Sequence, residues 1–511
     1  MSRARPSYRL LAVSAAIASL LLGAAASATS VPAQYAAVRA YAQAHGISPH
    51  AIGGTTGLPS YSAPGFGVTP RATCGPGSLP ETGRQGRVPK ADYDSGRAAK
   101  GYRCNTVEVG HYGTTGGFRV IRYVDKAGHE CAFYDSTLLF PRDARKDTPG
   151  TYVLDMSNPA KPVRTAVLST PAMVTPHESL RFNAKRGLLV AGAGSATTQV
   201  GFVDVYDASK DCRTPELKSS LPIGVLGHEG GFSPDGMTYW VTTTFNRGIT
   251  AIDLKDPASP SVIWHSLDYA VHGMSLSADG NRAYLADVLA DATSNFVSAT
   301  TQGGGGLQIL DVSQIQKRVT NPVVTSLSKL TWPEVTIPQN SVPVTIAGRH
   351  YLVEFDEYDE NVYQYAADEK VGAARIIDIT DDRHPKVVSR LRLAVHEKEA
   401  RADQGNDPGA TTVGQGYAAH YCAVPREVEP GIVACSMIAS GLRIFDIRNP
   451  LRPREVAYFN APKADLSDPS EGGGYAMSAA AFVPERREIW YVDSNTGFHA
   501  LRVTNGAWPN P

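Results

Sequence analysis

One unit recurs along most of this 511-residue chain. Each copy is an apolar run that ends in aspartate, followed by a polar turn, usually with proline, and a second short apolar run, as in "TYVLDMSNPAKPV" at 151–163. Six full copies share this aspartate, at Asp155, Asp207, Asp253, Asp311, Asp378 and Asp446. A seventh, degenerate copy at 497–503, "GFHALRV", has Arg502 at the aspartate position. Because the aspartate returns in every full copy, we expect it to accept main-chain N–H groups of the turn rather than to do chemistry.

A second pair of expected strands, joined by a tight turn, precedes each copy, for example "GFSPDGMTYWVTT" and "MSLSADGNRAYLAD". Four strands over roughly 40 to 70 residues have the size and plan of a propeller blade. We therefore predict an all-β, seven-bladed β-propeller over residues 105–511. The last blade has only three strands of its own, so residues 105–112, "NTVEVGHY", are expected to supply its fourth strand and close the ring.

The N-terminal region has the composition of an export signal. Residues 1–28 combine a basic start, an apolar stretch and the cleavage pattern Ala26-Ser27-Ala28. An uncleaved membrane anchor is the alternative, and no other stretch is long and apolar enough to span a membrane. Residues 29–104 are interpreted as a short helix followed by an irregular arm. The chain is thus expected to be secreted, or to lie at the cell surface or in the periplasm of a bacterium.

The charge balance limits the class of partner. The chain has 49 basic and 49 acidic residues and a formal net charge of zero. A nucleic-acid-binding protein usually shows a basic excess, so nucleic acid is excluded as a partner. We expect a monomer whose partner is an unidentified protein, glycan or small molecule.

Six cysteines in an exported chain predict up to three disulfides. Cys422 and Cys435 flank an expected hairpin, so they can face each other across it. Cys74 and Cys104 bracket a segment rich in proline and glycine, which leaves Cys131 and Cys212 as the third pair. Only the first pair has a geometric argument, and buried free thiols are the alternative.

The repeat resembles the LVIVD repeat, most closely in "YVLDMSNPAKP", with "LRIFDIRNPLRP" and "RIIDITDDRHP" following. The resemblance covers about residues 105–505. It implies a β-propeller of the kind found in exported or cell-surface proteins of bacteria and archaea. Proteins with this repeat typically have no assigned activity, and no catalytic motif carries over to this chain.

Histidines recur at one position when the blades are aligned on their inner hairpins. That position lies where the first strand of a blade enters the central channel, so its side chains are expected to converge. The candidate metal ligands are His177, Glu178, His228, Glu229, His272 and His420. A register slip of one residue would turn a ring to the other face of its sheet, and this applies most to His177 and His420. Other residues expected to line the channel are Asn340, Glu354 and Ser478.

Imidazoles with nearby carboxylates are ligands for a transition metal such as copper, zinc, iron or manganese. A polar channel filled with water, a strand-capping role for the histidines, and a site for an anion or small ligand are the alternatives. Calcium in the acidic run 354–361 is less favoured, because that run lacks the glycine and final glutamate of an EF-hand loop.

Two classes of function follow. The first is a binding or scaffold protein at the cell surface, which predicts an exposed aromatic patch. The second is a secreted metal-dependent enzyme, an oxidase or hydrolase, which predicts stoichiometric metal. Whether the chain is an enzyme stays open, because it has no G-x-S-x-G elbow, no H-E-x-x-H pair and no phosphate-cradling glycine loop.

Overall fold

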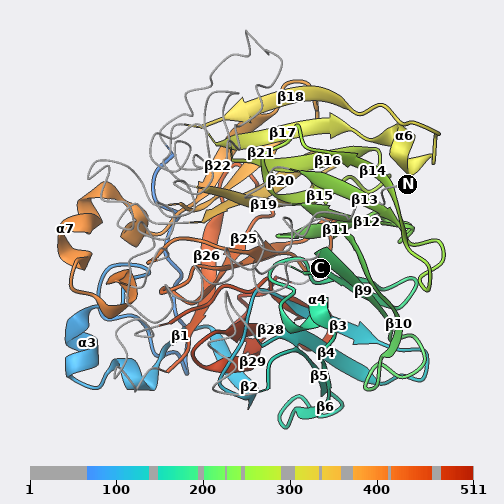
Figure 1. Ribbon diagram of the computed structural model, residues 1–511. Coiled ribbons are helices and arrows are strands. Elements are labelled where there is room, and N and C mark those ends of the chain that lie inside the picture. Colours follow the sequence, from blue (N-terminus) through green and yellow to red (C-terminus); the bar gives the residue numbers. More distant parts are fainter. Residues whose placement is uncertain are drawn as a thin grey trace, which may run out of the picture.

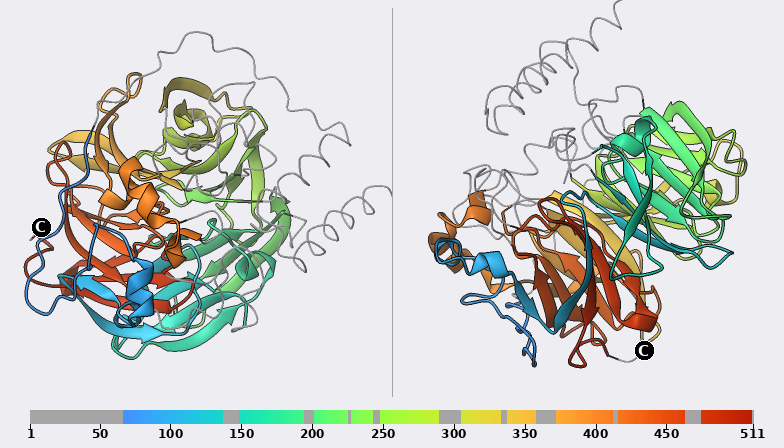
Figure 2. Two further views of the ribbon diagram at one scale, coloured as in Figure 1. Left: turned by 90° about the vertical axis from the view of Figure 1, so that its left-hand side faces the viewer. Right: turned by 90° about the horizontal axis from the view of Figure 1, so that it is seen from below.

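Seven antiparallel sheets follow one another around a ring in the computed structural model (Figures 1 and 2). The residues that it describes are 66–136, 148–193, 201–224, 227–242, 248–288, 305–332, 337–357, 372–411, 416–462 and 474–509. The prediction of an all-β, seven-bladed propeller is confirmed. The expected signal, the expected helix within 31–50 and the start of the arm lie outside the described residues.

The first four blades each contain four consecutive strands. Blade one has β3 (Val120–Val124), β4 (Glu130–Asp135), β5 (Thr151–Asp155) and β6 (Val163–Leu168). Blade two has β7 (Arg181–Asn183), β8 (Leu188–Gly192), β9 (Gly201–Asp207) and β10 (Glu216–Gly224). Blade three has β11 (Gly230–Phe232), β12 (Thr238–Thr242), β13 (Ile249–Asp253) and β14 (Ser261–Ser266). Blade four has β15 (Val271–Leu276), β16 (Arg282–Asp287), β17 (Gly306–Asp311) and β18 (Thr325–Thr331).

Blade five also has four consecutive strands, whereas blades six and seven each add a strand from the start of the described chain. Blade five has β19 (Ile337–Ile346), β20 (Arg349–Glu357), β21 (Ala374–Asp378) and β22 (Lys386–Leu391). Blade six has β23 (Cys422–Ala423), β24 (Ile432–Ser436), β25 (Leu442–Asp446), β26 (Arg454–Asn460) and, as a fifth strand, β1 (Tyr102–Cys104). Blade seven has β27 (Ala481–Val483), β28 (Glu488–Asp493), β29 (Gly497–Val503) and β2 (Thr106–Tyr112).

The ring closes as the sequence predicts. Strand β2 pairs antiparallel with β29, from Thr106 opposite Val503 to Tyr112 opposite Phe498. Neighbouring first strands contact each other, including β7 with β11, β11 with β15, β15 with β19, β19 with β23, and β27 with β3. The residues at the start of each first strand are therefore brought together at the centre of the ring.

The repeated aspartates have the expected structural role. Each one ends the third strand of its blade and accepts the main-chain N–H of the residue two positions later. The N···O distance is 2.9 Å in the pair Asp155–Ser157 and 2.8 Å in the pair Asp207–Ser209. The other pairs are Asp253–Lys255, Asp311–Ser313, Asp378–Thr380 and Asp446–Arg448.

The described part of the arm packs on blade six. It contains α3 (Lys90–Asp94), η1 (Ala98–Lys100) and β1. Arg443 on β25 is fully buried and forms ion pairs with Glu81 of the arm and with Glu455 on β26. This buried cluster ties the arm to the propeller.

Helices elsewhere are single turns in loops. They are α4 (Pro171–Val174), α6 (Ser313–Gln316), α7 (Arg401–Gln404), η4 (Ala394–His396), η5 (Lys398–Ala400), η6 (Pro408–Thr411) and η7 (Pro484–Arg486). Within the described ranges, none of the helices has the length and apolar character needed to cross a membrane.

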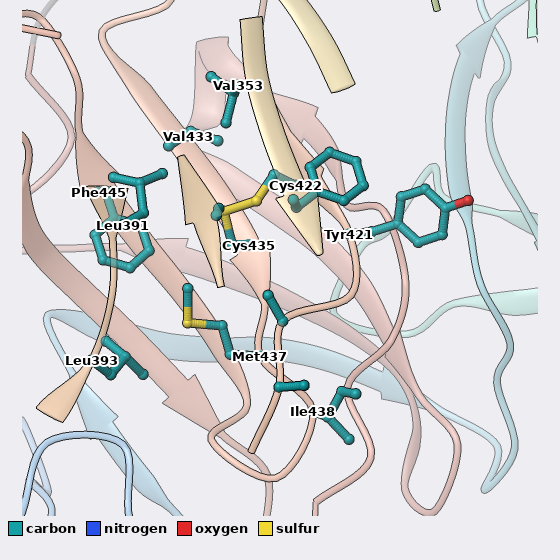
Figure 3. Packing of buried hydrophobic residues seen from close by; sticks show 14 of the residues in the cluster. Val353, Leu391, Leu393, Tyr421, Cys422, Val433, Cys435, Met437, Ile438 and Phe445 are labelled. Atoms are coloured by element: carbon teal, nitrogen blue, oxygen red, sulfur yellow. A yellow bond between two sulfur atoms is a disulfide. The ribbon is translucent and has the colours of Figure 1, made fainter. Parts of the chain in front are cut away.

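Three disulfides join the pairs that the sequence predicts. Cys422 and Cys435 lie directly opposite each other on β23 and β24, with Cα atoms 4.0 Å apart, inside an apolar cluster between blades five and six (Figure 3). Cys74 and Cys104 join the arm to β1. Cys131 on β4 is joined to Cys212, which lies in the turn before β10 and so links blade one to blade two.

Candidate metal centre in the central channel

The inner strands bring histidines from three blades into contact. His272 lies on β15, whereas His228 stands just before β11 and His420 just before β23. Hydrogen bonds to the second strand of the same blade fix two of these segments. The N–H of His228 donates to the carbonyl of Thr242 over 2.7 Å, and the N–H of His420 donates to that of Ser436 over 2.9 Å. The pairing of each inner hairpin therefore fixes the main-chain position from which the imidazole extends.

Imidazole nitrogens and carboxylate oxygens converge in this region. We call His228, His272, His420, Glu178 and Glu357 the channel ring. His228 Nε2 lies 2.9 Å from His272 Nε2 and 3.4 Å from Glu178 Oε2. His272 Nε2 lies 2.9 Å from Glu357 Oε1. His420 Nε2 lies 3.2 Å from Glu178 Oε1 and 3.3 Å from Glu357 Oε2. Nε2 of His228 thus lies beside Glu178, Nε2 of His272 lies beside Glu357, and Nε2 of His420 lies beside both carboxylates.

Separations of this size occur between neighbouring ligand atoms of a metal ion. Ligand atoms bound about 2.1 Å from an ion are about 3.0 Å apart at a right angle and about 3.4 Å apart at a tetrahedral angle. The five separations of the channel ring run from 2.9 to 3.4 Å. Two overlapping groups of residues have ligand atoms close enough to hold an ion: His177, Glu178 and His228, and Glu178, His272 and Glu357.

The opposite nitrogens of two imidazoles are tied to the main chain. His272 Nδ1 lies 3.2 Å from the carbonyl of Gln339, and His420 Nδ1 lies 2.8 Å from the carbonyl of Met477. A carbonyl only accepts, so Nδ1 carries the proton whenever these rings are neutral, and Nε2 keeps a free lone pair. This is the arrangement by which proteins orient histidine ligands of metals.

Two polar atoms of the channel ring lack hydrogen-bond partners in the described ranges. Glu178 Oε2 and His420 Nε2 are buried and have no hydrogen-bond partner within the described ranges, although oppositely charged groups lie near them. Buried polar atoms without a partner are uncommon, and each one calls for a water, an ion or another ligand. The distances of the ring are therefore not explained by hydrogen bonds alone.

Charge is concentrated in the ring. Burial favours neutral Glu178, but His272 and His420 outweigh burial and hold the pKa of its carboxyl well below the ordinary value. Burial lowers the pKa of His420, but the adjacent carboxylates of Glu178 and Glu357 raise it to about 9. Burial, together with the other imidazoles, holds the pKa of His228 well below its usual range. Burial also favours neutral Glu357, but His272 and His420 lower the pKa of its carboxyl, so both carboxylates favour positive charge beside them.

Glu357 was not among the predicted ligands, and Glu354 was expected in the channel instead. That expectation is wrong. Glu354 lies on the face of β20 that turns toward blade four, where Arg375 forms an ion pair with it and stacks on Trp332, 3.8 Å from the ring centroid. Glu357 is three residues further on, so it points to the opposite face.

The register of β20 explains why Glu357 was missed. In blades four and seven the second strand ends opposite the first residue of the third strand, at Asp287 and Asp493. In blade five that position is Phe355, and β20 continues for two more residues. In the acidic run 354–361, which was considered for calcium, Glu354 and Asp356 form ion pairs with Arg375. Residues 358–361 of that run lie outside the described ranges.

Glu229 lies near the channel ring but has other partners. Its carboxylate forms ion pairs with Arg181 and Arg119 and accepts hydrogen bonds from Asn340 Nδ2 at 2.5 and 2.7 Å. Gly273 leaves room for it, since a side chain there would begin 1.5 Å from Glu229 Oε2. The structure thus places Glu229 with the arginines, and places Asn340 as its hydrogen-bond donor.

Two further expected residues take different positions. His177 is buried with a φ of 51°, and its ring lies between Phe118 and His228, with centroids 4.5 and 4.3 Å away. His177 Nδ1 has no hydrogen-bond partner within the described ranges, so it can act as a further ligand. Ser478 is buried, and its hydroxyl bonds the main chain of Val492, which supports the inner hairpin of blade seven.

Comparisons with known proteins found structural neighbours but no relatives by sequence. No protein-family model matches the chain, so the LVIVD resemblance gains no support from that scan, and no curated protein matches its sequence. Among solved structures, hydrazine synthase of Kuenenia stuttgartiensis is 14% identical, with a TM-score of 0.47 over 77% of this chain and 97% of that one. The periplasmic gluconolactonase of Pseudomonas aeruginosa is 12% identical, with a TM-score of 0.46 over 68% and 85%. Likenesses of this strength give no information about activity.

Proposed function

We propose that this protein is an exported β-propeller that binds a divalent transition-metal ion in its central channel. The channel ring would supply the ligands, from His228, His272, His420, Glu178 and Glu357. The observation that carries the proposal is the convergence of three imidazole Nε2 atoms on two ionised carboxylates, with Nδ1 of two rings tied to main-chain carbonyls.

The donor set narrows the ion. Imidazole suits copper, zinc and iron, and carboxylate also suits manganese, so a mixed set favours one of these four. Calcium prefers oxygen ligands alone, which the channel ring does not offer. Two carboxylates also balance the charge of one divalent ion when the imidazoles are neutral.

Export is supported by the disulfides. All six cysteines are paired, and such bonds persist in secreted and periplasmic proteins but are rare in the cytosol. The predicted signal at 1–28 agrees with this assignment.

A metal-dependent reaction is the second candidate function. The side chain of His228 is 12% exposed, so solvent reaches the channel ring at this residue, as a catalytic metal site requires. A bound ion would supply Lewis-acid or redox chemistry. A binding or scaffold role at the cell surface predicts exposed aromatic side chains, and none in the described ranges is exposed. A protein or glycan partner therefore stays a prediction.

Metal analysis tests the proposal directly. The chain, purified without a histidine tag, is analysed by inductively coupled plasma mass spectrometry before and after dialysis against each of the four ions. We expect one equivalent of metal per chain in the wild type and less than a tenth of that in the His228→Ala, His272→Ala double variant. A matched control replaces the exposed His265 and His384 by alanine and should keep the metal. Retention of metal by the channel variant, or none in the wild type at micromolar ion, refutes the proposal.

A further inference from the structure

A second group of charged side chains adjoins the channel ring. It comes from the inner strands and the residues next to them, and we call it the arginine layer: Arg119, Arg181, Glu229, Asn340 and Tyr421. Its link to the ring is direct, because Glu229 follows His228 in the chain and the Tyr421 ring lies 5.0 Å from that of His420. Arg181 Nη1 also donates to the carbonyl of Glu178 over 2.8 Å.

The arginine layer holds more positive than negative charge. Glu229 is the one carboxylate within ion-pair distance of either Arg119 or Arg181 in the described ranges. Asp135, which is also close, accepts the main-chain N–H groups of Phe118 and Arg119 instead. Buried charges are normally compensated, so one guanidinium of this pair lacks a full partner.

Arg119 is the guanidinium with the weaker contacts. Its one hydrogen bond in the described ranges runs to Glu229 over 3.4 Å, whereas Arg181 bonds Glu229 and two main-chain carbonyls. Arg119 Nε is buried without a hydrogen-bond partner there. Burial and the neighbouring Arg181 also lower the pKa of Arg119, as expected for a cation whose charge is not offset.

The surroundings of Arg119 suit a negatively charged ligand. The guanidinium lies over the Tyr421 ring, 4.9 Å from its centroid, and the buried Tyr421 hydroxyl has no hydrogen-bond partner in the described ranges. The Arg119 side chain is 17% exposed, whereas its Nε is buried. A guanidinium offers parallel N–H donors that match two oxygens of a carboxylate or phosphate.

We propose that Arg119 and the Tyr421 hydroxyl bind a small oxyanion in the channel, beside the channel ring. The ligand is a carboxylate or inorganic phosphate, which share the paired oxygens that a guanidinium recognises. The inference deepens the proposed function by naming the class of molecule that shares the channel with the ion. The contact with Arg119 does not itself need the ion, so the two proposals can be tested separately.

Equilibrium dialysis with radiolabelled acetate and, separately, radiolabelled phosphate tests this site. The full chain is used both metal-free and loaded with one equivalent of Zn²⁺. We expect saturable binding of one equivalent of at least one anion, weakened about tenfold or more in Arg119→Gln, since hydrogen bonds to charged groups are lost. The control is Arg122→Gln, three residues further on in β3. The Arg122 side chain pairs with Glu130 and Glu485, so this variant should bind the anion as the wild type does.

Phosphate binding without acetate binding assigns a tetrahedral ligand, and the reverse assigns a planar one. Lack of saturable binding of either anion by the wild type, or equal binding by Arg119→Gln, overturns the inference. If Arg119→Gln does not fold, Tyr421→Phe carries the test, because it keeps the ring and removes only the hydroxyl; unchanged affinity then overturns it. If the protein binds an anion through Arg119 but binds no metal, this inference stands and only the proposed metal function is refuted.

Discussion

Replacing Glu229 by glutamine separates its role from that of Glu357. Glutamine keeps the shape of the side chain but removes the charge that Arg119 and Arg181 share. Breaking a buried ion pair by removing one partner costs about 3–5 kcal/mol, because the remaining charge is left buried and uncompensated. Glu229 is fully buried, so we expect this full range for Glu229→Gln.

The cost converts to a shift in melting temperature. An ordered domain of about 400 residues has an unfolding entropy of about 0.8 kcal/mol/K, so 3–5 kcal/mol lowers Tm by about 4–6 °C. Differential scanning calorimetry measures the shift, and metal analysis of the same sample measures the ion. Glu229→Gln should melt earlier and keep its metal, whereas Glu357→Gln should lose metal affinity.

A double variant checks the cause. Adding Arg119→Met to Glu229→Gln removes the guanidinium with the weaker contacts and should recover part of the lost stability, because fewer charges then remain uncompensated. Loss of metal in Glu229→Gln with an unchanged Tm would refute this account, since it would make Glu229 a ligand rather than the partner of the arginines.

Three further predictions concern the arm, the inner hairpin and proton competition. Arg443→Met leaves buried Glu455 without its cation and leaves Glu81 with Arg71 alone, so it should speed hydrogen exchange of residues 66–104, with Glu81→Gln partly restoring protection; unchanged exchange contradicts the anchoring role. Replacing Cys422 and Cys435 by alanine opens a loop with a sequence separation of 13 and should destabilise the protein by about 3 kcal/mol in calorimetry; an equal Tm argues against it. Burial lowers the pKa of His420, but Glu178 and Glu357 raise it to about 9, so below that pH a proton competes with the ion. Calorimetric metal affinity should therefore fall as pH falls from 9 to 6, with protons released on binding, and a flat profile would contradict the assignment.

The order of the blades and their closure could be predicted because the signals are periodic. Each copy repeats the same strand, aspartate and turn, and a seventh copy with three strands requires a fourth from elsewhere, which β2 provides. Strand β1 was not predicted, since three residues after a segment rich in glycine give no alternation to recognise. It forms because Tyr102–Cys104 pairs with β26 and the arm is tied to blade six.

The histidines of the site could be found by aligning repeats, but their partners could not. A one-dimensional alignment places His228 and Glu229 equally near the channel, while the backbone turns the first toward His272 and the second toward Arg181. Glu357 lies two residues beyond the aligned end of its strand, and only the extended register of β20 reveals it. Arg119 gives no sequence signal, because its role depends on Arg181 and Tyr421 from other blades.

The most direct test of the metal centre is an anomalous difference map from crystals of the tag-free protein, collected on either side of the absorption edge of the metal that copurifies. We predict one strong peak about 2.0–2.2 Å from Nε2 of His228, His272 and His420, with Glu178 or Glu357 completing the ligands. A map without a peak in the channel, or with its peak at the Asp125, His129 and Asp211 group near the Cys131–Cys212 disulfide, would contradict it.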